Sequence, residues 1–474
     1  MKKITILLFT VTTSLLLLNC KSENKKQDFS TLTKNYFDDK NVLDPLSATQ
    51  NGQNEYNDKL QFEMTDSYRK LQAAFFDKYQ TALQGIAIED LKEEEKNSYE
   101  IIKWEVEIGK ELLEQPTNLV PLHQFWGTHL TMGQFAGGTS AQPFKTEKDY
   151  TNFLERMDKY AVWIDSAIVY IKKGIDKGVV LPRALTLKLI PQFSEMSTPA
   201  VEDNLFYSPI KLMPLSFPDG IKEDLTKKYT EAINTRLIPQ YKKMADFLTK
   251  EYLPASRKTS GIGSLPFGKK LYATYTKQWT TTDMTPEQIH ELGLKEVARL
   301  TAEMEKVKVK VGFKGTLPEF FEEVRNKKEL KPFTTAEQVI ANFQSIHNRI
   351  KPNVDKLFSL QPKTKFEIRR TEAFREKTAS AEYNQGAADG SRPGIFYVPI
   401  PDVKNYNTYG DEDLFLHEAI PGHHFQISLQ QENESLPAFR KFNWFGAYGE
   451  GWALYTESLG EELGLYQDPY QYFG

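Results

Sequence analysis

Apolar positions recur every three to four residues between residues 289 and 304, and this spacing predicts an amphipathic helix. Thr285-Pro286-Glu287-Gln288 stands before it and supplies an N-cap, a proline at the first helical position and a capping-box glutamine. Similar start signals stand at Thr316 and Thr335, before further helical patterns. We therefore predict a chain that is mainly α-helical.

One stretch has the composition of a strand instead. Residues 394–400 are short, β-branched and aromatic, and Pro393 and Pro401 bound them. Pro399 lies within the stretch and cannot donate a ladder hydrogen bond, so we predict an edge strand. The expected fold is thus mainly α, with a small sheet or edge strand.

Composition and charge indicate a large globular protein. The 474 residues are 40% hydrophobic and 12% aromatic, enough for an extensive core, and the net charge is −4. Nucleic-acid binding needs a basic face, so we expect no nucleic-acid partner. Residues 263–270 are close to a phosphate-binding loop, but the last is lysine where serine or threonine would hold magnesium. We therefore expect no nucleotide either.

The first twenty residues have the pattern of an export signal. Met1-Lys2-Lys3 is basic, and residues 4–18 form an apolar run of fifteen residues, short of the roughly 20 that span a bilayer. Leu17-Leu18-Asn19-Cys20 is similar to a bacterial lipobox, and Cys20 is the only cysteine. We expect lipidation of Cys20 and a protein anchored to a bacterial membrane, in the periplasm or at the cell surface. The alternative is an ordinary cleaved signal.

The domain division follows from this start. Residues 1–20 are the predicted lipoprotein signal, and the polar residues 21–45 are expected to form a flexible tether. Residues 46–474 would then form one mainly helical domain, either two-lobed or built from two packed units.

The last residues predict the start of another helix. Asp468-Pro469 has the form of an N-cap and first helical residue, but only a few bulky aromatic residues follow. We expect the C-terminal part to continue beyond residue 474. In that case an open apolar face should lie near Trp452 and Phe473.

The residue types typical of a metal or catalytic site are concentrated in residues 417–424. Three of the seven histidines, His417, His423 and His424, lie here, and Glu418 follows the first of them. An acidic helical segment begins at Glu450. Two imidazoles and a carboxylate are typical zinc ligands, and a catalytic site leaves a fourth position for water. We predict a zinc centre with Glu418 handling the proton; the alternative is a kinked helix without metal.

The histidine spacing requires a break in the helix. On a continuous helix His423 would point roughly 120° away from His417, and His424 would lie about 10.5 Å along the axis. Pro421 disfavours the helix, and Gly422 can adopt the backbone angles of a break. We predict that the break brings His423 beside His417 as a ligand, and we keep His424 as the alternative.

The motif His417-Glu418-x-x-Pro421-Gly422-His423 resembles the H-E-x-x-P-G-H motif of a bacterial family known as domain of unknown function 885, which is similar in its motif logic to gluzincin metallopeptidases. The resemblance extends over most of the chain after about residue 50. Further matching segments are residues 263–268 with Tyr272, residues 285–290 with Gly293, and residues 389–397. The resemblance implies a gluzincin-like helical architecture with a strand beside the metal helix.

The resemblance also implies roles for single residues. Glu450-Gly451-Trp452-Ala453 is similar to the N-E-G-F-A segment of M1-type aminopeptidases, which makes Glu450 the third zinc ligand. Glu457 would support a ligand from the same helical face.

The implied activity is zinc-dependent hydrolysis of a peptide substrate, with Glu418 as general base. Tyr397, Tyr455 and His424 are the candidates for stabilising the oxyanion. The competing hypothesis is a surface lipoprotein that binds a ligand or partner and has a non-catalytic metal centre.

Overall fold

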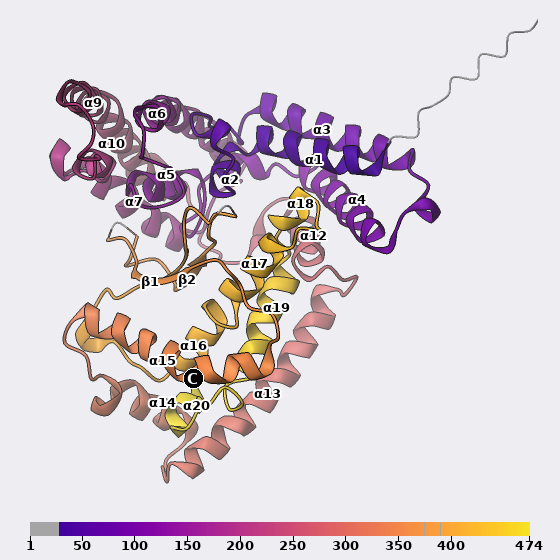
Figure 1. The fold of residues 1–474 in the computed structure, drawn as a ribbon, viewed down its shortest axis with the longest axis vertical. Coiled ribbons are helices and arrows are strands. Elements are labelled where there is room, and N and C mark those ends of the chain that lie inside the picture. Colours follow the sequence, from indigo (N-terminus) through magenta and orange to yellow (C-terminus); the bar gives the residue numbers. More distant parts are fainter. Residues whose placement is uncertain (1–27, 374, 389) are drawn as a thin grey trace, which may run out of the picture.

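The computed structural model describes residues 28–373, 375–388 and 390–474. The predicted signal and Cys20 lie outside these residues. The chain is mainly helical with one small sheet, as expected from the sequence. Figure 1 shows two lobes: helices of the first half, in indigo to magenta, lie above a second lobe that contains the sheet and the C-terminal helices.

The first lobe consists of helices alone. Its core surrounds the long helix α6, which buries Tyr160, Trp163 and Ile164 completely. The helices are α1 (Phe29–Leu43), α2 (Pro45–Gln50), α3 (Asp66–Gln84), α4 (Glu93–Leu113), α5 (Thr128–Ala136), α6 (Glu147–Asp176), α7 (Arg183–Ser197), α8 (Ser208–Lys211), α9 (Asp219–Ala232), α10 (Ile238–Phe247), α11 (Leu253–Ala255) and α12 (Gly268–Thr280).

The flexible tether predicted for residues 21–45 is wrong from Phe29 onward. These residues form α1, whose N-terminus is capped by the side chain of Asp28. Phe29, Leu32 and Tyr36 recur at helical spacing and pack into a core with α3 and α4. The polar composition of the segment concealed this apolar stripe, which is sufficient to dock a helix.

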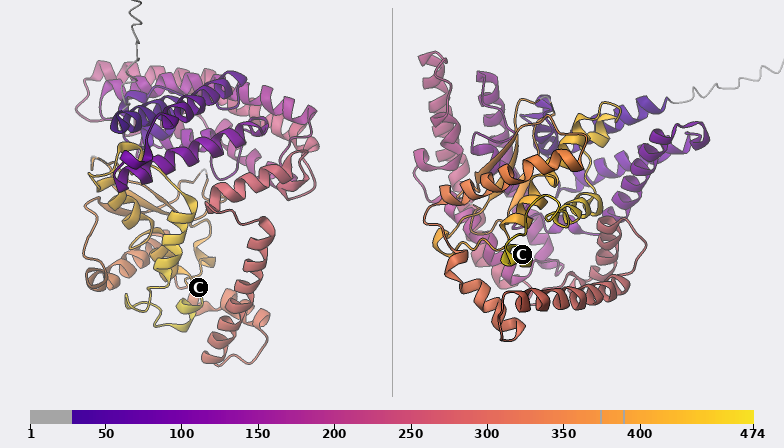
Figure 2. Two further views of the ribbon diagram at one scale, coloured as in Figure 1. Left: turned by 90° about the vertical axis from the view of Figure 1, so that its right-hand side faces the viewer. Right: turned by 60° about the horizontal axis from the view of Figure 1, so that its bottom comes forward.

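The second lobe begins after residue 285 with a long helix that is largely exposed and buries only Val307 (Figure 2). The capping boxes predicted at Thr285, Thr316 and Thr335 are all present. The helices are α13 (Pro286–Lys310), α14 (Leu317–Asn326), α15 (Ala336–Leu357), α16 (Asp411–Glu418), α17 (His423–Glu432), α18 (Ala438–Lys441), α19 (Gly446–Glu457) and α20 (Pro469–Phe473).

The sheet has three strands in the order β1 (Phe366–Arg370), β3 (Gly394–Val398), β2 (Glu382–Asn384). β3 pairs in parallel with β1 and in antiparallel fashion with β2. The predicted edge strand is therefore the central one. It ends at Val398, so Pro399 lies outside the ladder and imposes no edge position. The edge strand nearer α17 is β2.

The two lobes meet where α18 packs against α1. Phe439 of α18 is buried in the core of the first lobe, where its ring meets the edge of Tyr36 at 5.5 Å between centroids. The second lobe is thus joined to the first by a residue that belongs to the core of the first.

The last helix begins as predicted, with the Asp468 side chain accepting a hydrogen bond from the Tyr470 N–H. Phe473 packs against Phe320 of α14. The outer face of α19 exposes Tyr448 and Leu454. In the described part of the chain no helix combines the length and apolar character needed to cross a bilayer.

Candidate metal centre

The backbone breaks between α16 and α17. α16 ends at Glu418 and α17 begins at His423, so the break predicted at Pro421-Gly422 is confirmed. Gly422 lies against the end of α16: a Cβ at this position would stand 1.9 Å from the His417 carbonyl oxygen and 2.2 Å from that of Leu416. Only glycine permits this approach, which brings the start of α17 back to His417.

Three donor groups converge at the break. The rings of His417 and His423 have centroids 4.8 Å apart. Oε2 of Glu450, from α19, lies 3.3 Å from Nε2 of His417 and 3.7 Å from Nε2 of His423. One donor atom from each residue falls within 4.8 Å of the others. The structure therefore brings together the three residues predicted as zinc ligands.

α19 is held in position by its packing against the break. The Thr456 hydroxyl donates to the Leu416 carbonyl at 2.9 Å. The Trp452 indole N–H donates to the Pro421 carbonyl at 2.8 Å. Both acceptors are backbone groups freed where α16 ends, so the same break that joins the histidines also orients Glu450.

A second carboxylate orients His417. Oε1 of Glu457 lies 2.7 Å from Nδ1 of His417, which leaves Nε2 directed toward Glu450. Such a carboxylate fixes the ring and its tautomer. Asp413 lies beside this pair: burial, and then the charge of Glu457, raise the pKa of Asp413 to about 7. Glu457 is thus in its predicted place, whereas Asp413 was not predicted.

His423 is buried and uncharged. Burial, and then the neighbouring His417, lower its pKa to about 4. Its Nδ1 has no hydrogen-bond partner among the described residues. A neutral imidazole is the form that binds metals.

Glu418 faces the same space but lies apart from the three donors. The residue is 6% exposed, and its Oε2 has no hydrogen-bond partner in the described structure. Burial raises its pKa to about 7, and the charges of Glu450 and Glu382 act in the same direction. A carboxyl group with this pKa can accept and release a proton near neutral pH.

His424 lies on the other side of α17. Its ring packs against Phe366 of β1, and its Nδ1 lies 3.0 Å from the Tyr383 hydroxyl of β2. It does not line the cleft that contains the three donors. The alternatives of His424 as a ligand or as an oxyanion donor are therefore wrong, because successive helical residues point about 100° apart.

The two predicted tyrosines have different positions. Tyr397 of β3 lines the cleft, and the Arg375 guanidinium lies 5.3 Å above its ring. Burial raises the pKa of Tyr397 to about 12. Tyr455 is 53% exposed and packs on Trp452 outside the cleft. Its predicted role is wrong because, five residues after Glu450, it points roughly 140° away on the helix.

The donors lie in a cleft of about 820 Å³ between the lobes. α2 and α5 of the first lobe form one wall, and β2, β3, α16, α17 and α19 form the other. A larger cavity of about 1430 Å³, lined in part by Phe425, contains none of the three donors. The smaller cleft is thus the candidate site.

Besides Asp413, sequence reasoning missed the cleft residues Glu372, Glu382 and Trp444. Glu382 belongs to β2, a strand of three residues that is too short to show an alternating pattern. The Trp444 ring meets the edge of the His423 ring at 5.5 Å between centroids.

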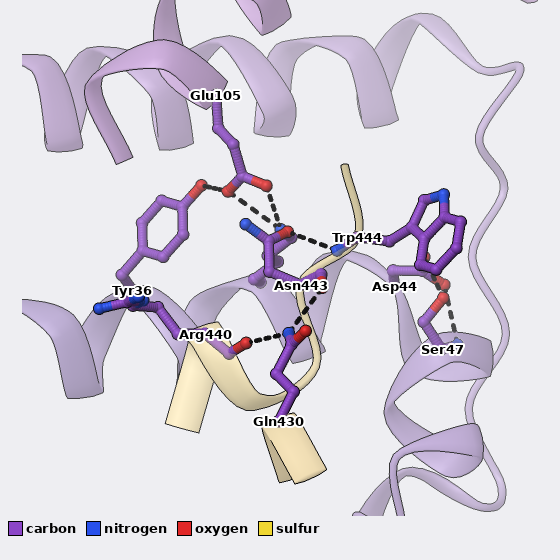
Figure 3. A network of polar contacts seen from close by, with 9 residues as sticks. Tyr36, Asp44, Ser47, Glu105, Gln430, Arg440, Asn443 and Trp444 are labelled. Carbon is purple, nitrogen blue, oxygen red and sulfur yellow. Dashed lines mark hydrogen bonds and ion pairs between the residues drawn. The ribbon is translucent and has the colours of Figure 1, made fainter. Parts of the chain in front are cut away.

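A polar network holds the turn before Trp444 (Figure 3). Gln430 of α17 donates to the carbonyls of Arg440 and Asn443, and the Asn443 side chain accepts from the Trp444 N–H. Nearby, Tyr36 of the first lobe contacts Glu105. The wall beside His423 is therefore built at the junction of the two lobes.

The family assignment follows from comparison with known proteins. Residues 45–474 match the family described as bacterial protein of unknown function (DUF885). The chain belongs to this family. No curated protein matches the chain.

Two solved structures share the fold. One, from Colwellia psychrerythraea, has a TM-score of 0.84 and 22% sequence identity. The other, from Shewanella oneidensis, has a TM-score of 0.63 and 17% identity. In both cases the match covers 94% of this chain and 80% of the other. Both proteins are described by the words "putative lipoprotein".

The close approach at Gly422 generates a test. Gly422→Ala should lower the free energy of unfolding by about 2 kcal/mol or more, because the added methyl group overlaps two carbonyl oxygens. Gly451→Ala is the matched control on α19: no heavy atom lies within 4 Å of its Cβ position, and alanine favours the helix. Urea denaturation measures both. Equal midpoints for the two variants would contradict the close packing.

Proposed function

We propose that this protein is a zinc-dependent hydrolase that cleaves peptides. The observation that carries the proposal is the convergence of His417, His423 and Glu450 beside the buried carboxylate of Glu418, whose Oε2 has no described hydrogen-bond partner. A binding protein with a structural metal has no need of a buried base with a free oxygen beside the ligands. This arrangement favours hydrolysis over the alternative of a non-catalytic metal centre.

The residues fit a zinc ion by their chemistry. Two imidazoles and one carboxylate match the ligand preference of zinc and leave a coordination position open. Glu457 supports His417 as carboxylates commonly support zinc-binding histidines. His417, His423 and Glu450 would therefore hold the ion, which when bound lowers the pKa of water to about 7 and polarises a carbonyl group.

Glu418 moves the proton in this proposal. Its free Oε2 accepts a proton from the attacking water and then gives it to the leaving amine. The pKa of about 7, raised by burial, suits both steps because neither direction of transfer is strongly uphill. Tyr397 is the cleft tyrosine whose hydroxyl group would donate to the developing oxyanion.

The position of β2 supports a peptide as the substrate. β2 is an edge strand, and its residues Glu382 and Tyr383 line the same cleft as Glu418. An extended chain that pairs with this edge would pass directly beside the base. Edge strands bind extended peptides through main-chain hydrogen bonds, which gives a reason to favour a peptide over a small ester.

We also propose that the protein is exported and anchored through a lipid on Cys20. The basic start, the apolar run and the lone cysteine support this, and so do the words "putative lipoprotein" in the description of the two similar structures. Cys20 itself lies outside the described residues.

Glu418→Gln tests the base. The variant should lose peptide hydrolysis by at least about a hundredfold, because the amide cannot accept the proton. Its zinc content should equal that of the parent, since Glu418 is not a proposed ligand. Glu450→Gln is the matched variant and should lose zinc. Digestion of a peptide library and metal analysis give the two readouts, and loss of zinc from Glu418→Gln would reject the assignment.

The adjacent histidines provide a second test. His423→Ala should lose zinc, whereas His424→Ala should retain it and unfold more easily, because Tyr383 loses its partner. Metal content and thermal unfolding of both variants distinguish the roles. Loss of zinc from His424→Ala but not from His423→Ala would show that His424, and not His423, is the ligand.

Cys20→Ser tests the anchor. The variant should fail to incorporate labelled lipid and should leave the membrane fraction, whereas the parent remains there. Cell fractionation with lipid labelling measures this. Unchanged membrane association without lipid would rule out anchoring at this residue.

A further inference from the structure

The cleft has a strong excess of acidic over basic residues. Among the described residues that line it, Arg392 is the sole arginine or lysine, and six are acidic: Glu372, Glu382, Asp413, Glu418, Glu450 and Glu457. Three of these, Glu418, Glu450 and Glu457, have roles in the proposed metal centre, and Asp413 lies beside Glu457. Glu372 and Glu382 remain without a role.

These two carboxylates form a clamp around one arginine. Nε of Arg375 donates to Oε2 of Glu372 at 2.7 Å, and its Nη2 lies 2.7 Å from Oε1 of Glu382. Arg375 is 6% exposed and rests on the ring of Tyr397. One guanidinium thus serves two carboxylates, so the group retains a net charge of about −1 when all three are ionised.

One oxygen of each carboxylate remains available. Gln134 and Asn384 also donate to Oε1 of Glu382, and neither these bonds nor the Arg375 contact engages its Oε2. Oε1 of Glu372 is likewise without a donor in the described structure. The two side chains are 33% and 22% exposed, and both face the cleft. A purely structural clamp would not need two carboxylates that open onto the cleft.

The clamp lies next to the reaction centre. Glu382 is paired in the sheet with Tyr397, and its charge acts on Glu418. Glu418 is a second indication that a ligand enters here, because the residue is only 6% exposed, its Oε2 has no described partner, and it lines the same cleft. A group bound at the clamp would therefore belong to a molecule that also reaches Glu418.

We propose that Glu372 and Glu382, held by Arg375, form a subsite that binds a cationic nitrogen of the substrate. An ammonium group or a guanidinium fits the two free oxygens, and either would balance the residual charge through charge-assisted hydrogen bonds. In a peptide this nitrogen is the terminal ammonium or a basic side chain. The inference rests on the proposed function in that it takes this cleft as the place where the substrate lies.

Calorimetric titration with three short peptide amides tests the subsite. One has a free N-terminus, one is N-acetylated and neutral, and one is N-acetylated with a single lysine. The zinc-loaded Glu418→Gln protein serves as the parent because it should bind without turnover. At least one charged peptide should bind about tenfold more tightly than the neutral one. Preference for the free N-terminus identifies the terminal ammonium, and preference for lysine identifies a side chain.

Substitutions in the clamp locate the preference. When Glu372→Gln or Glu382→Gln is added to the Glu418→Gln parent, the preference for the charged peptide should fall to about twofold or less. Each substitution removes one negative charge and keeps the shape of the side chain. Glu462→Gln, at an exposed position outside the cleft, should leave it unchanged. Two single variants are used so that poor folding of one does not decide the test. Equal binding of charged and neutral peptides to the parent, or a preference that survives both substitutions, overturns the proposal.

The wild-type protein separates this proposal from the hydrolase. Charge preference without any hydrolysis would reject the hydrolase and retain the subsite. Hydrolysis of charged and neutral peptides at equal kcat/KM, together with equal binding, would reject the subsite alone.

Discussion

The close approach of Gly422 to the end of α16 is the constraint on which the candidate site depends. The glycine lies against two carbonyl groups that a continuous helix would have used for hydrogen bonding. The chain turns within four residues, and His423 returns to the level of His417. The freed carbonyls of Leu416 and Pro421 in turn bind α19, which carries the third donor. One steric condition thus positions all three residues.

Neighbouring histidines have separate tasks as a result. His423 faces the cleft, whereas His424 joins α17 to β2 through Tyr383 and to β1 through Phe366. The strand that carries Glu382 and the helix that carries His423 are therefore fixed to each other. Donor atoms that bind a small metal ion tolerate little displacement from one another. The connection through His424 would limit such displacement of the helix that carries His423.

Much of this arrangement could be predicted from local sequence. Pro421 and Gly422 predict the break directly, and the capping boxes predict where helices start, because these signals act over a few residues. The failures had non-local causes. β3 is central because of its partners, which no local pattern reveals. Glu382 became visible only when the sheet placed it opposite Tyr397. The errors at α1 and Tyr455 had a local cause instead. The helical periodicity that contradicts each prediction was visible in the sequence. At α1 the polar composition of the segment outweighed it, and at Tyr455 the short distance to Glu450 in the sequence did. Zinc and hydrolysis stay predictions.

The burial of Phe439 in the first lobe has a consequence for dissecting the molecule. The segment that leads from α17 to α19 passes through α18, and α18 contributes its phenylalanine to a core formed by α1, α3 and α4. Trp444 and Glu450 follow five and eleven residues after Phe439, so the course of the chain that carries them depends on that anchorage. The second lobe, although it contains every proposed metal ligand, is therefore not an autonomous module. If the second lobe were excised, Phe439 of α18 would lose the core in which it is buried, and α19 with Glu450 would lose that support. The smallest transferable unit therefore includes both lobes.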